Sequence, residues 1–179
     1  MSRDDGFVDK WRARWPEWQV AEVFLPVSIR ERSLAWFALR QELLDAAWAG
    51  ADARPGEAKL GWWIEELQGW SQGARRHPLG AVLQSQPVPW ARLAATLPAL
   101  AATRERVTDL EEACAGLLPF ASVVAEVDGL LANEAPAPAD DAALHLLAQR
   151  AVFADDNAVP LAVRARLGAD ADAGQATRA

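Results

Sequence analysis

Residues 60–70, LGWWIEELQGW, place three tryptophans on one short segment and predict an amphipathic α-helix. Successive residues of an α-helix lie about 100° apart around its axis. At this spacing, five apolar side chains fall within an arc of about 120°. They belong to Leu60, Trp63, Ile64, Leu67 and Trp70. We therefore expect this face of the helix to pack in a hydrophobic core.

Trp62 lies outside this arc, on the opposite side of the helix. A large aromatic side chain exposed there would leave apolar surface in water, so it needs a covering partner. We expect the Trp-rich opening segment, residues 1–23, to pack on the core, with Trp11, Trp15 and Trp18 covering Trp62. The alternative is that Trp62 contacts an external protein partner or a lipid.

The rest of the chain also predicts helices. Ala and Leu are abundant and β-branched residues are few, which favours helix over sheet. Proline and glycine residues divide the sequence into separate segments. The expected helices cover residues 28–49, 55–73, 78–84, 90–107, 109–132, 140–153 and 160–167. We predict an all-α, single-domain helical array over residues 24–167, followed by a disordered tail at 168–179.

Composition and charge exclude several classes of partner. The formal net charge of -7 argues against nucleic acid and against anionic lipid surfaces, because both attract basic proteins. The single cysteine, Cys114, excludes an internal disulfide and a cysteine-based zinc site. We find neither the apolar run of a signal peptide nor an uncharged apolar stretch of about 18 residues. We therefore predict a cytoplasmic protein with no transmembrane span.

Arg40 is the unusual residue of the expected helix 28–49. It falls in the middle of the apolar face that contains Ile29, Trp36, Leu43, Leu44 and Ala47. A buried guanidinium must be paired, because an isolated charge in the protein interior costs several kcal/mol. Its partner is either a carboxylate from a neighbouring helix or an anionic ligand in a cavity.

Several motifs occur in a recognisable order. They are Phe24-Leu25-Pro26, Arg30, LAWFALRQEL at 34–43, LGWWIEEL at 60–67 and His77-Pro78-Leu79, followed by FASVV at 120–124, AQRA at 148–151 and VPL at 159–161. This order resembles the squalene and phytoene synthase family, and most closely the divergent branch related to mitochondrial complex I assembly factors. The resemblance implies a helical terpenoid synthase fold around a central cavity that binds isoprenoid diphosphates through magnesium.

The resemblance also implies two aspartate-rich motifs, each with carboxylates at positions i and i+4. Such carboxylates share one helix face and can bridge Mg²⁺ to diphosphate oxygens. Where the first motif should lie, only Glu42 and Asp45 are present, three residues apart on a polar face that we expect to be solvated. Residues 146–154, where the second motif should lie, contain no carboxylate. The chain is also shorter than the family's usual length, so we expect a truncated fold.

These departures favour loss of catalysis. We predict a catalytically degenerate member of the family, without a cofactor or a metal site, that acts as a binding or assembly protein. Its partner would be an apolar or isoprenoid ligand, held with the help of Arg40, or a protein that contacts Trp62. The alternative is a magnesium-dependent transferase acting on isoprenoid diphosphates, with Glu42 and Asp45 as metal ligands. The oligomeric state stays open.

Overall fold

The computed structural model describes residues 5–105, 107 and 109–153, and this part of the chain contains helices and no strand. The all-α prediction is confirmed. The helices are α1 (Asp5–Arg14), α2 (Trp18–Ala21), the 3-10 helix η1 (Glu22–Phe24), α3 (Val27–Trp48), α4 (Arg54–Ser71), α5 (Gly80–Leu83), α6 (Trp90–Ala102), α7 (Leu110–Ala132) and α8 (Ala139–Phe153). The expected helix at 160–167 and the tail at 168–179 lie outside the described residues.

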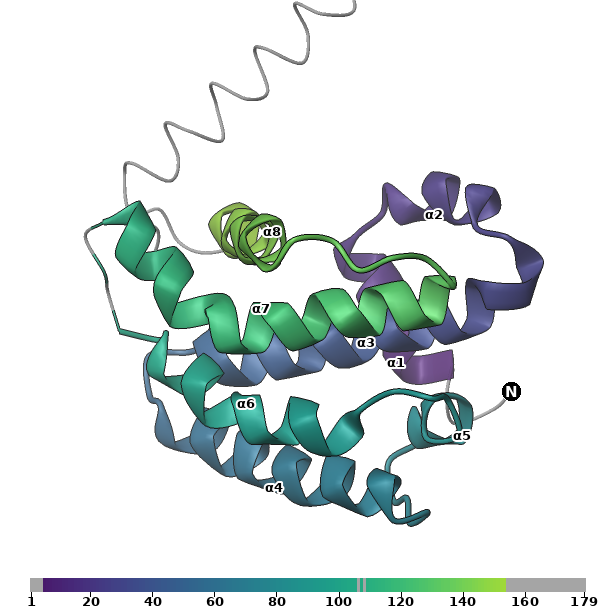
Figure 1. The fold of residues 1–179 in the computed structure, drawn as a ribbon, viewed down its shortest axis with the longest axis horizontal. Helices are drawn as coiled ribbons and strands as arrows, with labels where there is room; N and C mark the ends of the chain where they lie inside the picture. The colour runs from purple at the N-terminus through teal and green to yellow at the C-terminus, as the bar shows by residue number, and fades with distance from the viewer. Residues whose placement is uncertain (1–4, 106, 108, 154–179) are drawn as a thin grey trace, which may run out of the picture.

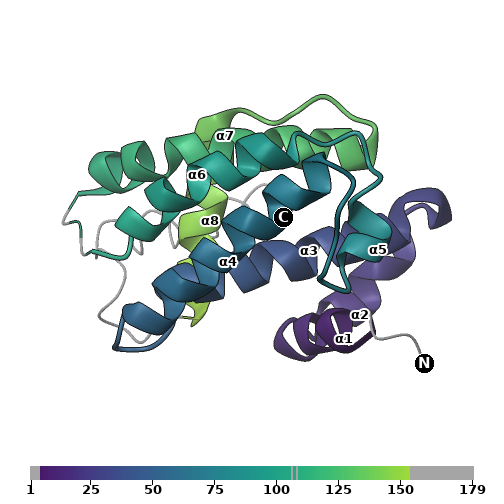
Figure 2. The ribbon, with the colours of Figure 1, turned by 90° about the horizontal axis from the view of Figure 1, so that it is seen from below.

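The long helix α3 runs through the middle of the molecule (Figure 1). It contacts α1, α4, α5, α6 and α7, and α4 packs closely against α6. Helix α8 lies on α7 and crosses it at a steep angle. Helices α1, α2 and α5 gather at one end of the molecule (Figure 2). This arrangement gives α3 a different neighbour on each of its sides.

The hydrophobic core contains the aromatic residues expected from residues 60–70. Leu60, Trp63, Leu67 and Trp70 are buried, and Ile64 is half-buried. The ring of Trp70 meets that of Trp90 edge to face, with centroids 5.1 Å apart. Aromatic pairs in this geometry contribute about 0.5 to 1.5 kcal/mol beyond their burial. The apolar face of α4 therefore packs against α6.

The start of α7 agrees with the expectation from the sequence, whereas the end of α6 does not. Asp109 begins α7, because its side chain accepts a hydrogen bond from the Glu112 N–H at 3.2 Å. Helix α6 was expected to reach residue 107 but ends at Ala102. There, the Thr103 hydroxyl accepts a hydrogen bond from the Trp48 indole N–H at 2.9 Å. The Arg104 guanidinium donates to the backbone carbonyls of Ala47 and Gly50. These contacts with the end of α3 stop α6 early.

The N-terminal tryptophans do not cover Trp62, so that prediction is wrong. The ring of Trp11 is buried and lies 5.4 Å from that of Phe37 on α3, and the ring of Trp18 lies 5.0 Å from the same phenyl. Trp62 instead meets Trp63 edge to face and keeps 36% of its surface exposed. The opening segment packs on α3 because polar side chains of α3 bind α1, as described below.

Helix α7 is long and apolar enough to cross a membrane by length and composition, with a mean hydropathy of 1.6 over an 18-residue window. This stretch differs from the uncharged apolar run that a membrane span was expected to need, because it contains Glu126 and Asp128. Half of the window is buried inside the fold, against neighbours that include α6 and α8. Core helices of globular proteins meet the same criterion.

Candidate functional site

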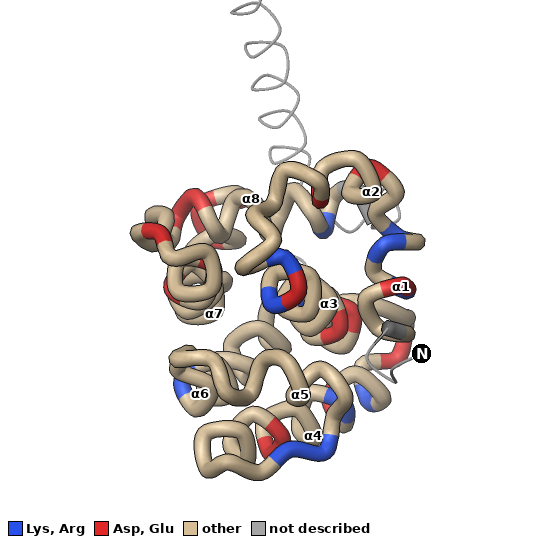
Figure 3. Tube along the Cα trace, turned by 90° about the vertical axis from the view of Figure 1, so that its right-hand side faces the viewer, with Lys and Arg blue, Asp and Glu red and all other residues tan. Residues whose placement is uncertain are grey.

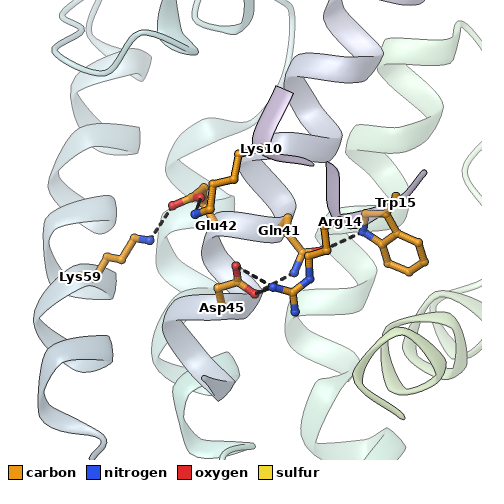
Figure 4. Close-up of polar contacts among 7 residues, drawn as sticks. All are labelled: Lys10, Arg14, Trp15, Gln41, Glu42, Asp45 and Lys59. Atoms are coloured by element: carbon orange, nitrogen blue, oxygen red, sulfur yellow. Dashed lines mark hydrogen bonds and ion pairs between the residues drawn. The ribbon is translucent and has the colours of Figure 1, made fainter. Parts of the chain in front are cut away.

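Helix α3 carries the three side chains singled out in the sequence, and they point to different parts of the molecule. Glu42 and Asp45 face α1 (Figure 4), whereas Arg40 faces α7. The divergence follows from the helical spacing, because Arg40 and Glu42 are two residues apart and lie about 200° apart around the axis. The structure therefore does not bring the three residues together into one site.

Glu42 was expected on a solvated face, but it is buried, with 5% of its surface exposed. Lys10 of α1 bonds to Oε1 at 2.5 Å, and Lys59 of α4 bonds to Oε2 at 2.6 Å. Burial raises the pKa of Glu42, but hydrogen bonds from the two lysines outweigh this effect and lower it. The carboxylate is therefore charged and joins three helices.

Asp45 has a similar environment one turn further along α3. Its Oδ1 lies 3.2 Å from the Arg14 guanidinium of α1 and accepts a hydrogen bond from the Gln41 amide at 2.8 Å. The Gln41 oxygen in turn accepts the Trp15 indole N–H at 3.2 Å. These contacts and those of Glu42 hold the opening segment on α3 (Figure 4).

This environment does not fit magnesium. Hard divalent cations need several oxygen ligands that are free to coordinate. Here two carboxylates face Lys10, Lys59 and Arg14, so a metal ion would have to displace three cations. The described part of the chain contains no group of three or more His, Cys, Asp and Glu side chains that could hold a metal.

Arg40 is paired with a carboxylate from a neighbouring helix, one of the two partners considered for it. Its Nη1 lies 3.2 Å from Asp128 Oδ2 of α7, and the Trp36 indole N–H also donates to Asp128, at 2.5 Å. Burial lowers the pKa of Arg40, and the nearby Asp128 charge only partly opposes this effect. Only one guanidinium nitrogen is used in this pairing.

Arg40 also lies at the junction of two cavities. The larger, of about 380 Å³, is bounded by α2, α3, α7 and α8, and the smaller, of about 100 Å³, lies towards α1. Four residues line both cavities: Trp18, Phe37, Arg40 and His145. The larger cavity has mostly apolar walls, including Leu25, Ile29, Trp36, Leu131 and Ala142. Apolar walls beside a few polar groups are typical of small-ligand sites.

His145 of α8 adds a second polar group at this junction. Its Nε2 lies 3.1 Å from the Gln149 amide nitrogen. Burial lowers the pKa of His145, and the Arg40 charge lowers it further, against the opposing effect of Asp128. The neutral imidazole is therefore favoured, and it can donate or accept one hydrogen bond at each nitrogen according to its tautomer.

Sequence reasoning missed Asp128 and His145 as parts of this site. Asp128 is one of two acids in the otherwise apolar second half of α7, and that isolation was the available signal. His145 is a single histidine on an otherwise mostly apolar part of α8, and no motif of the sequence marks it. Its place beside Arg40 depends on the packing of α8 against α7, which no local pattern reveals.

No family model, curated protein or solved structure matches this chain.

Proposed function

We propose that the protein is a non-catalytic binding or assembly protein, a degenerate relative of the squalene and phytoene synthases, that holds an apolar ligand with an anionic end. The observation that carries this proposal is the position of Arg40 at the junction of the two cavities. The apolar walls would receive the body of the ligand. Arg40 and His145 would face its anionic end.

The balance of charges at Arg40 supports an amphipathic rather than a purely apolar ligand. Asp128 accepts hydrogen bonds from one nitrogen of Arg40, while a guanidinium carries five N–H donors. Asp128 is 40% exposed, so water screens its charge more than that of Arg40. An anionic group would therefore find partly unsatisfied donors in an apolar surrounding, where hydrogen bonds to charged groups are strongest.

The environment of Glu42 and Asp45 supports a non-catalytic role. The magnesium-dependent alternative needs these carboxylates as metal ligands, but internal lysine and arginine side chains already neutralise them. We expect the purified protein, incubated with magnesium and farnesyl or geranylgeranyl diphosphate, to release no pyrophosphate above a control without protein. Release that is abolished by combining Glu42→Gln and Asp45→Asn would establish the enzymatic alternative instead.

Ligand binding can be tested by calorimetry and thermal unfolding without magnesium. We expect farnesyl diphosphate to raise the melting temperature more than farnesol or inorganic diphosphate alone, because it uses both the apolar walls and Arg40. Arg40→Met should reduce the affinity for farnesyl diphosphate about tenfold and leave that for farnesol nearly unchanged. Equal affinity of wild type and Arg40→Met for the diphosphate would reject the role of Arg40.

Two alanines of the loop before α8 provide a matched pair of variants that test where the ligand binds. Ala137 lines the larger cavity and Ala135 does not, although both are exposed. Ala137→Phe should fill part of the cavity and weaken binding, whereas Ala135→Phe should bind as the wild type does. If the two variants bind equally well, the ligand occupies another place.

A further inference from the structure

The segment from α2 to the start of α3 exposes an unusual amount of apolar surface. Among the described residues, six large hydrophobic side chains are exposed, and four of them lie here. These four, which we call the arm patch, are Val20, Val23, Phe24 and Val27, with exposed fractions of 70%, 62%, 82% and 81%. Helix α2 and η1 stand off from the helical body (Figure 1). Apolar patches on the order of a few hundred Å² usually mark a contact surface.

A hollow of about 430 Å³ adjoins the arm patch. It lies between α1, α3 and α5, and its walls combine apolar side chains, including Val8, Leu34, Leu79 and Val82, with the charged residues Arg12, Arg30 and Glu31. Val27 belongs both to the arm patch and to the wall of this hollow. A protruding phenyl group and a partly apolar hollow therefore lie next to each other on one face of the protein.

Two charged residues on the same face lack an oppositely charged partner within the described part of the chain. Arg30 donates to the carbonyls of Val23 and Leu25 through Nη2, at 3.4 and 2.9 Å, and pairs with no described carboxylate. Its Nε is buried and has no hydrogen-bond partner among the described residues. Glu31, which is exposed, makes no ion pair with a described residue. Basic and acidic residues lie side by side at this end of α3 (Figure 3).

Together these features fit a second copy of the same chain. A two-fold axis brings a face against itself, so a protrusion and a hollow on that face can fill each other twice. The same operation can bring Arg30 of one copy towards Glu31 of the other, which favours correct pairing. An anionic membrane fits less well, because the face carries both signs of charge and the whole chain is acidic.

We infer that the protein forms a symmetric homodimer through this face, with Phe24 of each copy inserted between α1, α3 and α5 of the other. The inference does not depend on the proposed ligand. Filling the ligand cavity with Ala137→Phe should leave the dimer unchanged.

Sedimentation of the full chain over a range of concentrations tests the inference. We expect a concentration-dependent equilibrium between monomer and dimer. Phe24→Ala should weaken dimerisation at least tenfold without changing the far-ultraviolet circular dichroism, because it removes the phenyl group that packs on the apolar walls of the hollow. Leu130→Ala is the matched control, since Leu130 is also exposed but lies on α7 outside the arm patch; it should dimerise as the wild type does.

A charge-exchange experiment tests the symmetry. Glu31→Arg and Arg30→Glu should each weaken the homodimer, because each places like charges across the axis. Mixing the two variants should restore dimers that contain one copy of each. A wild-type protein that stays monomeric at the highest concentration measured, or a Phe24→Ala variant that dimerises as the wild type does, would overturn the inference. Monomers that float with neutral lipid vesicles in a Phe24-dependent manner would also overturn it, in favour of a lipid contact.

Discussion

Glu66 shows how a single buried carboxylate can organise a loop. It is buried on α4 and accepts four hydrogen bonds, from the backbone N–H groups of Arg76 and His77, both at 2.7 Å, from the Trp70 indole at 2.8 Å, and from Arg76 Nε at 2.9 Å. Burial raises the pKa of Glu66, but these bonds outweigh the effect and lower it to about 2. The charged carboxylate thus fastens the chain between α4 and α5.

Replacing Glu66 with Gln should destabilise the protein in a pH-dependent way. The folded pKa lies below the ordinary value of 4.5, so the contribution of the carboxylate is complete above that pH and is lost as the pH falls towards 2. We expect the variant to lose about 3 kcal/mol of unfolding free energy at pH 7. Urea denaturation at pH 7, 5, 4 and 3 should show the difference shrinking.

The neighbouring Glu65 provides the control for this experiment. Its side chain is mostly exposed and lies 3.7 Å from Arg76. Glu65→Gln should change the unfolding free energy by less than about 0.5 kcal/mol, as is usual for surface ion pairs. A difference between wild type and Glu66→Gln that stays constant from pH 7 to pH 3 would contradict the assigned pKa.

At the scale of the helices, α4 can approach α3 closely because of one glycine. A Cβ atom on Gly56 would overlap the backbone carbonyl of Ala46 on α3. Gly61, five residues nearer the centre of α4, has no neighbouring atom within 4 Å of the corresponding position. The same residue type therefore has a packing role at one position and none at the other.

The two glycines of α4 should respond oppositely to replacement by alanine. Gly56→Ala must push α4 away from α3 and should lower the unfolding free energy by about 1 to 3 kcal/mol. Gly61→Ala should raise it by about 0.5 to 1 kcal/mol, because alanine favours the helix and meets no neighbour. Thermal and chemical unfolding of both variants checks the signs. Changes of the same sign would mean that α3 and α4 do not approach as closely as described.

At the scale of the whole molecule, Glu42 connects α1, α3 and α4 through Lys10 and Lys59. Both lysines are partly exposed, whereas the carboxylate is buried. Either lysine can neutralise the charge when the other is absent. The cost of losing both should therefore exceed the sum of the separate costs, because an unpaired buried charge would remain.

A double-mutant cycle measures this coupling. Lys10→Met and Lys59→Met should each lower the unfolding free energy by about 1 kcal/mol or less, since each pair is half in solvent. The double variant should lose about 3 kcal/mol or more. Adding Glu42→Gln to the double variant should recover part of the loss by removing the stranded charge. Additive effects of the two lysines would show that Glu42 is better hydrated than its burial indicates.

The sequence by itself determined the helices from α3 to α8 and the apolar side of α4. The expected helix at 28–49 is α3, Val27–Trp48, and the arc of residues 60–70 packs in the core as predicted. Such features depend on contacts between residues three or four apart and on caps such as Asp109. The need of Arg40 for a partner was also predictable, because it follows from the cost of a buried charge.

Only the tertiary structure decided which side chains meet. Arg40 and its partner Asp128 are 88 residues apart, and Lys10 and Glu42 are 32 apart. Helical periodicity tells which side of a helix is polar, but not that another helix will cover that side with cations, so Glu42 was wrongly expected in solvent. Helical periodicity also does not predict that Trp11 and Trp18 pack against Phe37 and not against Trp62. The physical reason is that an apolar or charged side chain can pair with many partners of similar chemistry. Which partner it meets depends on how all the helices pack together.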